Sequence, residues 1–241
     1  MLESANLTAF MLDIRANLQG VQERVAAACA RANRRSGDVL LIGVSKTVEL
    51  ERIRLAVEAG VQALGENRVQ EAKEKIESIG RPVPWHLIGS LQTNKARDAA
   101  RLFDWIQSVD RVELAQELDR RAHQTERALR VLVQVNIGEE PQKGGALPAE
   151  LKRLLDAITG LKNLEVRGLM CIPPATDSAE ASRPWFRRLR ELRDAVGLEH
   201  CSMGMSGDFE VAIEEGATMV RVGTAIFGPR PPRAAVTEGG A

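Results

Sequence analysis

Eight short runs rich in β-branched and other apolar residues alternate with helix-forming stretches along most of this chain. The runs lie at 39–46, 61–67, 85–90, 105–109, 130–137, 165–172, 199–206 and 218–224. The first of them are almost continuously apolar, as parallel strands covered by helices on both faces are. Eight strand–helix units in about 190 residues predict an α/β fold, a single (β/α)8 TIM barrel. An open, doubly wound sheet is the structural alternative.

The segment before the first run has the pattern of one long helix. Its apolar residues recur at steps of three and four and form one stripe: Leu7, Phe10, Met11, Ile14, Leu18, Val21 and Val25. Gly37, in "RRSGD", is expected to end this helix. We therefore divide the chain into an N-terminal helix at 1–36 that packs on the barrel, a barrel at 37–230, and a flexible tail at 231–241.

The charge and composition of the chain argue against several classes of partner. Lys plus Arg and Asp plus Glu number 33 each, and aromatic residues make up only 3%, so we expect neither nucleic acid nor a membrane surface as a ligand. No apolar run reaches the ~18 residues of a membrane span, and the first residues lack the pattern of a signal peptide. Three widely separated cysteines suit a reducing cytoplasm, and three histidines without ligand spacing predict no metal site.

Polar residues and glycines gather at the carboxyl ends of the predicted strands. They are Lys46, Asn67, Gly89, Ser90, Asn136, Ser206, Arg221, Gly223 and Thr224. Taken singly, Asn67 can be a turn residue and Arg221 the partner of a carboxylate. In a closed barrel, however, these strand ends converge on one mouth, where the active sites of this fold lie. We therefore expect a functional site at this mouth.

The last two units carry the features of a phosphate site. In "RVGTAIFG", Gly223 allows close approach of the backbone, Thr224 adds a hydroxyl, and "AIFG" can form a short helix. In "GMSGD", Ser206 and the N–H of Gly207 can face the same anion. The loops after strands seven and eight are the frequent phosphate site of such barrels. The alternative is that these residues are turn glycines and a helix cap.

Lys46 ends an apolar strand, where a charge is costly unless it has a use. A partly desolvated lysine loses affinity for its proton, and its free amine is a nucleophile. It can condense with a ligand that has both a carbonyl and a phosphate, either pyridoxal phosphate or the sugar phosphate of a Schiff-base aldolase. The alternative is a lysine that extends from the strand end to water. His86, beside Trp85 inside the third run, fits a core histidine.

Six motifs of the chain closely resemble the YggS/PROSC family of pyridoxal phosphate homeostasis proteins. They are "VSKT", "GENRVQE", "WHLIGSLQTNK", "RGLMCIPP", "SMGMSGD" and "MVRVGTAIFG", and they occur in order between residues 39 and 228. The resemblance implies one barrel like the N-terminal domain of alanine racemase, with pyridoxal 5'-phosphate bound as an aldimine on Lys46.

By motif position, the resemblance assigns further roles around the cofactor. The phosphate falls on Ser206, Gly223 and Thr224, and Arg221 faces the pyridine nitrogen. Asn67 and His86 lie in family motifs near the cofactor. Lys95 and Lys143 can be phosphate contacts at the surface or simply solvated charges.

An arginine at the pyridine nitrogen keeps that nitrogen unprotonated, which makes the ring a poor electron sink. Racemisation also needs an acid/base group on each face of the substrate, and this chain has no tyrosine. We therefore expect a monomeric carrier that buffers pyridoxal phosphate for apo-enzymes and takes part in vitamin B6 and amino-acid homeostasis. A weak racemase is the alternative, and a class I aldolase is a third possibility.

Overall fold

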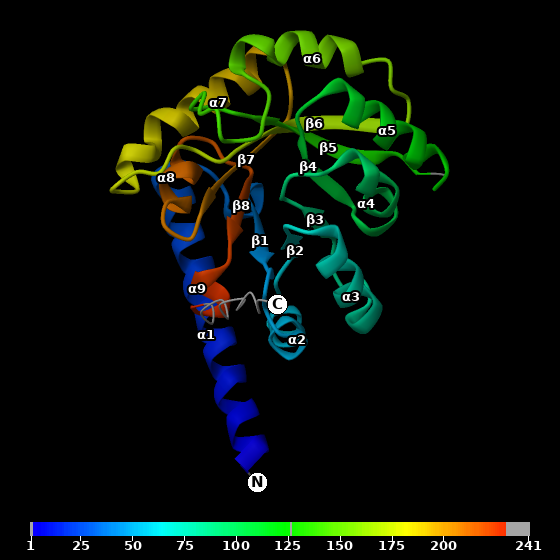
Figure 1. The fold of residues 1–241 in the computed structure, drawn as a ribbon. Helices are drawn as coiled ribbons and strands as arrows, with labels where there is room; N and C mark the ends of the chain where they lie inside the picture. The colour runs from blue at the N-terminus through cyan, green and yellow to red at the C-terminus, as the bar shows by residue number, and fades with distance from the viewer. Residues whose placement is uncertain (1, 126, 230–241) are drawn as a thin grey trace, which may run out of the picture.

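Eight parallel strands form a closed barrel in chain order, with β8 paired to β1 (Figure 1). The computed structural model describes residues 2–125 and 127–229. The strands are β1 (Leu40–Val44), β2 (Ala63–Glu66), β3 (Trp85–Leu87), β4 (Trp105–Val109), β5 (Leu129–Val135), β6 (Leu164–Cys171), β7 (His200–Met205) and β8 (Met219–Val222). The predicted (β/α)8 barrel is therefore confirmed, and the open sheet is excluded.

The helices that follow the strands form the outer layer of the barrel. They are α2 (Leu50–Glu58), α3 (Val69–Ile79), α4 (Ala96–Leu102), α5 (Val112–His123), α6 (Leu151–Ile158), α7 (Arg183–Ala195), α8 (Phe209–Glu214) and α9 (Thr224–Phe227). The main core lies between this layer and the strands, where large side chains such as Trp85, Phe103 and Phe186 are fully buried. A second apolar cluster, which includes Ile42 and Met170, is separate from the main core.

Most strands end before the polar residues that follow them. Lys46 and Asn67 lie just beyond β1 and β2, and Ser206 and Gly223 lie just beyond β7 and β8. The chain leaves the sheet at these points, so the predicted strands were too long at their carboxyl ends. The polar residues therefore belong to the loops above the barrel, where their side chains are not restricted to alternate faces of a strand.

The long N-terminal helix α1 (Leu2–Arg31) lies beside α2, α8 and α9 (Figure 1). Its residues Ile14, Leu18, Val21 and Val25 are buried, as their spacing predicted. The side chains of Leu7, Phe10 and Met11 are outside the described residues, as is the segment 231–241.

The end of α1 differs from the sequence prediction. The helix ends at Arg31, and Asn33 takes the left-handed conformation with φ 52°. Gly37 lies instead in a short 3-10 turn, Ser36–Asp38, that leads into β1. Asparagine tolerates the left-handed region better than most residues do, so no glycine was needed at this position.

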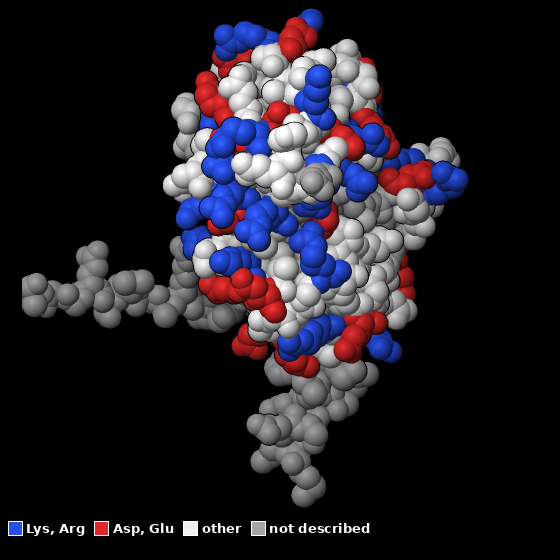
Figure 2. All heavy atoms as spheres, turned by 90° about the vertical axis from the view of Figure 1, so that its right-hand side faces the viewer, with Lys and Arg blue, Asp and Glu red and all other residues white. Residues whose placement is uncertain are grey.

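Lys and Arg side chains gather on the face of the barrel that carries α3, α4 and α5, with acidic side chains among them (Figure 2). Arg81 and Arg127 share Asp104, and Arg120 and Arg121 share Glu117. Carboxylates therefore offset part of the positive charge here. Within the described ranges, no helix combines the length and hydrophobicity needed to span a membrane.

Candidate functional site

A cavity of about 250 Å3 opens at the mouth of the barrel, where the carboxyl ends of the strands meet. Seven of the eight predicted site residues line it: Lys46, Asn67, Ser206, Gly207, Arg221, Gly223 and Thr224. Val44, Ile88, Ile172 and Met205 form the apolar part of its wall. The fold thus brings together polar residues from the first two and the last two strand–helix units, and apolar residues from the third and sixth units as well. We call this cavity the mouth pocket.

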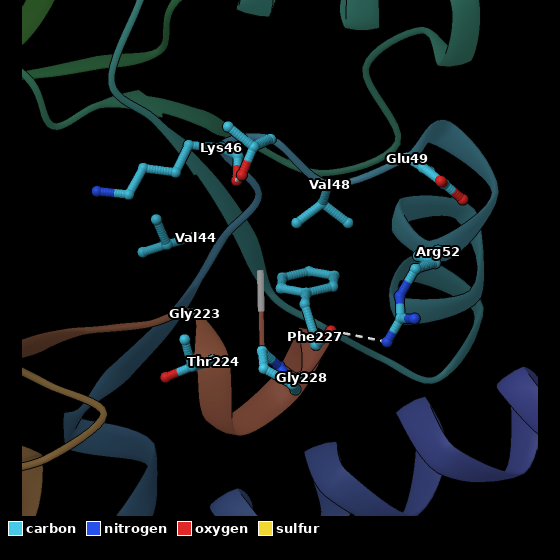
Figure 3. A pocket seen from close by; sticks show the side chains of 11 residues that line it. Val44, Lys46, Val48, Glu49, Arg52, Gly223, Thr224, Phe227 and Gly228 are labelled. Carbon is cyan, nitrogen blue, oxygen red and sulfur yellow. Dashed lines mark hydrogen bonds between the residues drawn. The ribbon is translucent and has the colours of Figure 1, made fainter. Parts of the chain in front are cut away.

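Lys46 lies between the mouth pocket and a second cavity of about 160 Å3. The two cavities share Val44, Lys46, Gly223 and Thr224. Figure 3 shows the Lys46 side chain extending past Val44, away from Phe227 and Arg52 in the second cavity. The side chain is half-buried rather than fully exposed. Its amine is therefore directed away from Arg52, which lines the second cavity.

The turn after β7 and the start of α9 are joined by Ser206. Its Oγ accepts hydrogen bonds from the N–H groups of Gly223 (3.2 Å) and Ala225 (3.5 Å). Asp208 fixes the same turn, since its Oδ1 accepts from the Met205 N–H at 2.7 Å. A hydroxyl and several backbone N–H groups therefore meet at one corner of the mouth pocket. Groups of this kind bind phosphate oxygens.

Arg221, on β8, is buried at the base of the mouth pocket, with 4% of its surface exposed. Its Nη1 donates to Ser202 Oγ at 2.7 Å, and its Nη2 donates to the Cys171 carbonyl at 2.8 Å. Burial lowers the pKa of Arg221 below its usual value, and the Cys171 thiol and Asp208 oppose this shift. These two acceptors, on β7 and β6, hold the guanidinium in place, so its orientation relative to the mouth pocket is fixed.

The hydrogen bonds of Arg221 continue through the barrel interior to His86. Ser202 Oγ donates to Gln107 Oε1 at 2.6 Å, and Gln107 Nε2 donates to His86 Nδ1 at 2.9 Å. Burial lowers the pKa of His86 to about 3, so its ring is neutral at pH 7. With Nδ1 as an acceptor, the proton is on Nε2, which has no hydrogen-bond partner among the described residues.

The structure does not place His86 in the lining of the mouth pocket. His86 is fully buried and stacked on Trp105, with ring centroids 5.6 Å apart. Hydrogen bonds through Gln107 and Ser202, which sequence reasoning missed, link it to Arg221 at the mouth. The sequence signal for them was the presence of Gln107 inside the strand pattern "WIQSV" and of Ser202 inside the strand pattern "EHCSMGMS".

The two other lysines considered from the sequence differ from Lys46 in their surroundings. Lys95 is exposed, in a 3-10 turn before α4. Lys143 is half-buried, and its Nζ contacts the Glu140 carboxylate (2.5 Å) and the Pro173 carbonyl (2.9 Å). Neither lysine lines the mouth pocket.

Comparison with known proteins gives consistent matches over nearly the whole chain. Residues 16–231 match the family model described as alanine racemase, N-terminal domain. A pyridoxal phosphate homeostasis protein of Aquifex aeolicus is 48% identical over 220 residues, which are 88% of this chain and 96% of that protein. Its counterpart in Escherichia coli K12 is 40% identical over 232 residues, 91% and 98% of the two chains.

Solved structures agree with this result. PipY of Synechococcus elongatus, solved with pyridoxal phosphate bound, superposes with a TM-score of 0.77 at 39% identity and covers 86% of this chain and 100% of its own. The alanine racemase of Clostridium difficile superposes with a TM-score of 0.67 at 17% identity, and the match covers 92% of this chain but 58% of the racemase. The second likeness is one of fold alone.

Proposed function

Because the chain belongs to the family of pyridoxal phosphate homeostasis proteins, we propose that it binds pyridoxal 5'-phosphate in the mouth pocket and carries it to apo-enzymes. The observation that supports this most directly is the composition of one cavity. It combines a lysine amine, a buried guanidinium and a corner of hydroxyl and N–H groups. A cofactor with an aldehyde, a ring nitrogen and a phosphate can contact these three features with its three groups.

The residues of the mouth pocket fit this cofactor group by group. The bound cofactor would supply an aldehyde, and the Lys46 amine, after losing its proton, would add to the aldehyde carbon and form a C=N bond with loss of one water. Ser206, Gly207, Gly223 and Thr224 are the proposed phosphate ligands, since they share one corner. Asn67 completes the polar wall.

Arg221 is the proposed partner of the ring nitrogen. It is a permanent cation whose acceptors, Ser202 and the Cys171 carbonyl, fix it in place. It can donate a hydrogen bond to an unprotonated ring nitrogen but cannot accept a proton from a protonated one. The site therefore favours holding the cofactor over stabilising a carbanion on it.

Carrier function is favoured over racemisation by the side chains that line the mouth pocket. Racemisation needs a proton donor and acceptor on each face of the substrate. The described lining has no carboxyl, imidazole or thiol, and the chain has no tyrosine. Among the described lining residues Lys46 alone carries an amine, and one group cannot serve both faces of the substrate.

We place this carrier in the cytoplasm as a monomer, with apo-enzymes as its partners. The three cysteines support a reducing compartment, because all are free and buried in the structure. Release requires only hydrolysis of the C=N bond or its exchange with another amine.

The test is the absorbance spectrum of the purified protein after addition of pyridoxal phosphate. We expect the visible band of a lysine Schiff base in the wild type and its loss in Lys46→Ala. We also expect transfer to an apo-transaminase to be faster than from free cofactor. A sustained, Lys46-dependent loss of optical rotation from L-alanine would support the racemase instead, and a colourless protein would disprove cofactor binding.

A further inference from the structure

A buried ion cluster lies directly behind the Lys46 segment, on the side of β2 and α3. Its centre is the Lys75 ammonium on α3, which is nine-tenths buried. Lys75 Nζ donates to Glu66 Oε1 (2.7 Å), Glu71 Oε1 (2.7 Å) and the Ser45 carbonyl (2.6 Å). Glu66 is fully buried, and burial raises its pKa more than Lys75 and Ser45 lower it. We call Glu66, Glu71 and Lys75 the Lys75 cluster.

The Lys75 cluster holds the residue on each side of Lys46. On one side it binds Ser45 twice, because the Ser45 carbonyl accepts from Lys75 and Ser45 Oγ donates to Glu66 Oε1 at 2.6 Å. On the other side, the Thr47 N–H donates to Glu71 Oε1 at 2.5 Å. Three consecutive residues thus have a defined path, and the middle one is Lys46.

The backbone at Thr47 shows that this path is not the one the chain would adopt alone. Thr47 has φ 60°, in the left-handed region that a β-branched residue strongly disfavours. Such conformations persist where the surroundings over-determine them, and they concentrate at functional sites. Here the restraints are the Glu71 hydrogen bond, that of Thr47 Oγ1, which donates to the Lys46 carbonyl at 2.6 Å, and the turn bond from the Val48 N–H to the Ser45 carbonyl at 3.0 Å.

We propose that the Lys75 cluster is a positioning device for Lys46: it fixes the Ser45–Thr47 backbone so that the Lys46 amine is directed into the mouth pocket. None of its three residues lines that pocket. They act through the backbone of Lys46 and touch neither the cofactor nor the reacting atoms. This inference rests on the proposed function, since it concerns the lysine that forms the C=N bond.

The expected loss in the rate of C=N bond formation follows from the geometry that the reaction requires. Forming the C=N bond requires the amine to approach the aldehyde carbon from one direction, and a shift of about 1 Å in such an arrangement can cost ~100-fold in rate. We expect the release of one restraint to move Lys46 by part of that distance. We therefore expect about a tenfold slower reaction for each lost contact.

The experiment measures the rate of C=N bond formation by stopped-flow absorbance after apo-protein is mixed with pyridoxal phosphate, together with the thermal midpoint of each apo-variant. Lys75→Met removes the centre of the cluster. Its control is Lys73→Met on the same helix. Lys73 is half-exposed, and its ion pair with Glu77 is long, at 4.0 Å. Since Lys75→Met leaves two carboxylates facing each other and can unfold the protein, Glu71→Ala is the second variant, with the exposed Glu74→Ala as its control.

Glu71→Gln separates positioning from stability. The amide oxygen of Gln can still accept from the Thr47 N–H, so Glu71→Gln should react at nearly the wild-type rate while Glu71→Ala is about tenfold slower. A purely stabilising cluster would instead lower the thermal midpoint of Glu71→Ala and leave its rate within twofold of Glu74→Ala. That result would refute the positioning inference and leave the proposed function intact. If the wild type forms no Schiff-base band, the proposed function fails, and this inference fails with it.

Discussion

We expect acid to destabilise this protein through one buried side chain, His86. The ring is fully buried, it accepts a hydrogen bond from Gln107, and burial lowers its pKa from 6.5 to about 3. In the unfolded chain the same ring takes up a proton near its ordinary pKa. As the pH falls, the unfolded state therefore binds this proton before the folded state does, and stability is lost.

The size of the effect follows from the two pKa values. The contribution of His86 is intact above about pH 6.5 and decreases until the pH reaches about 3. The complete loss corresponds to about 5 kcal/mol at 1.36 kcal/mol per unit. Between about pH 7 and about pH 5, linkage gives a loss of about 2 kcal/mol from this residue.

Urea unfolding at both pH values, on wild type and His86→Asn, measures this loss. The Asn side chain can still accept from Gln107 but does not titrate. His86→Asn should be less stable at pH 7, because it loses the stacking on Trp105. Its further loss on acidification should be smaller than that of the wild type by about 2 kcal/mol. His200, whose pKa burial also lowers, is present in both proteins and cancels in the comparison. Equal losses in the two proteins would refute the reasoning.

Two further predictions concern the mouth pocket and the thiols. Ser206→Ala should weaken pyridoxal phosphate affinity at least several-fold in an absorbance titration, because a hydrogen bond to a charged group is worth about 1.5–3 kcal/mol. Gly223→Val keeps the backbone N–H but places a branched side chain where the phosphate approaches the backbone, so it should also weaken affinity several-fold. Unchanged affinity in both would remove the phosphate assignment. Cys171 and Cys201 should react slowly with a thiol reagent in the native protein and rapidly after unfolding, since burial raises the pKa of each thiol to about 12. Rapid native labelling of either cysteine would contradict the buried geometry.

The fold was predictable because its main signal is local and repeated. Each strand is a short apolar run followed by a helix, so the number of units favours a barrel, and the closure between β8 and β1 distinguishes it from an open sheet. Strand ends were less predictable. They depend on where the backbone departs from the sheet, and at Thr47 that departure uses a conformation that the residue type disfavours.

The mouth pocket was predictable for a related reason: strand-end residues converge in any closed parallel barrel. Sequence reasoning did not identify the residues that act through others, because their partners lie on distant strands. Gln107 and Ser202 reach Arg221 by hydrogen bonds between β4, β7 and β8. Lys75, by its spacing from Glu71, looks like half of an ordinary surface i, i+4 pair on α3. Its burial, and its contacts with Glu66 and Ser45, are known only from the packing of α3 against β2 and against the segment that follows β1.

The placement of α1 has a consequence for synthesis of the protein. Arg24 of α1 pairs with Glu210 of α8 through two hydrogen bonds, across 186 residues of sequence. At roughly 5–20 residues per second, a ribosome needs on the order of 10–40 s to make the intervening chain. During that time the apolar stripe of α1 has no α8 or α9 to cover it. Translation speed and early chaperone contact should therefore affect the yield of folded protein.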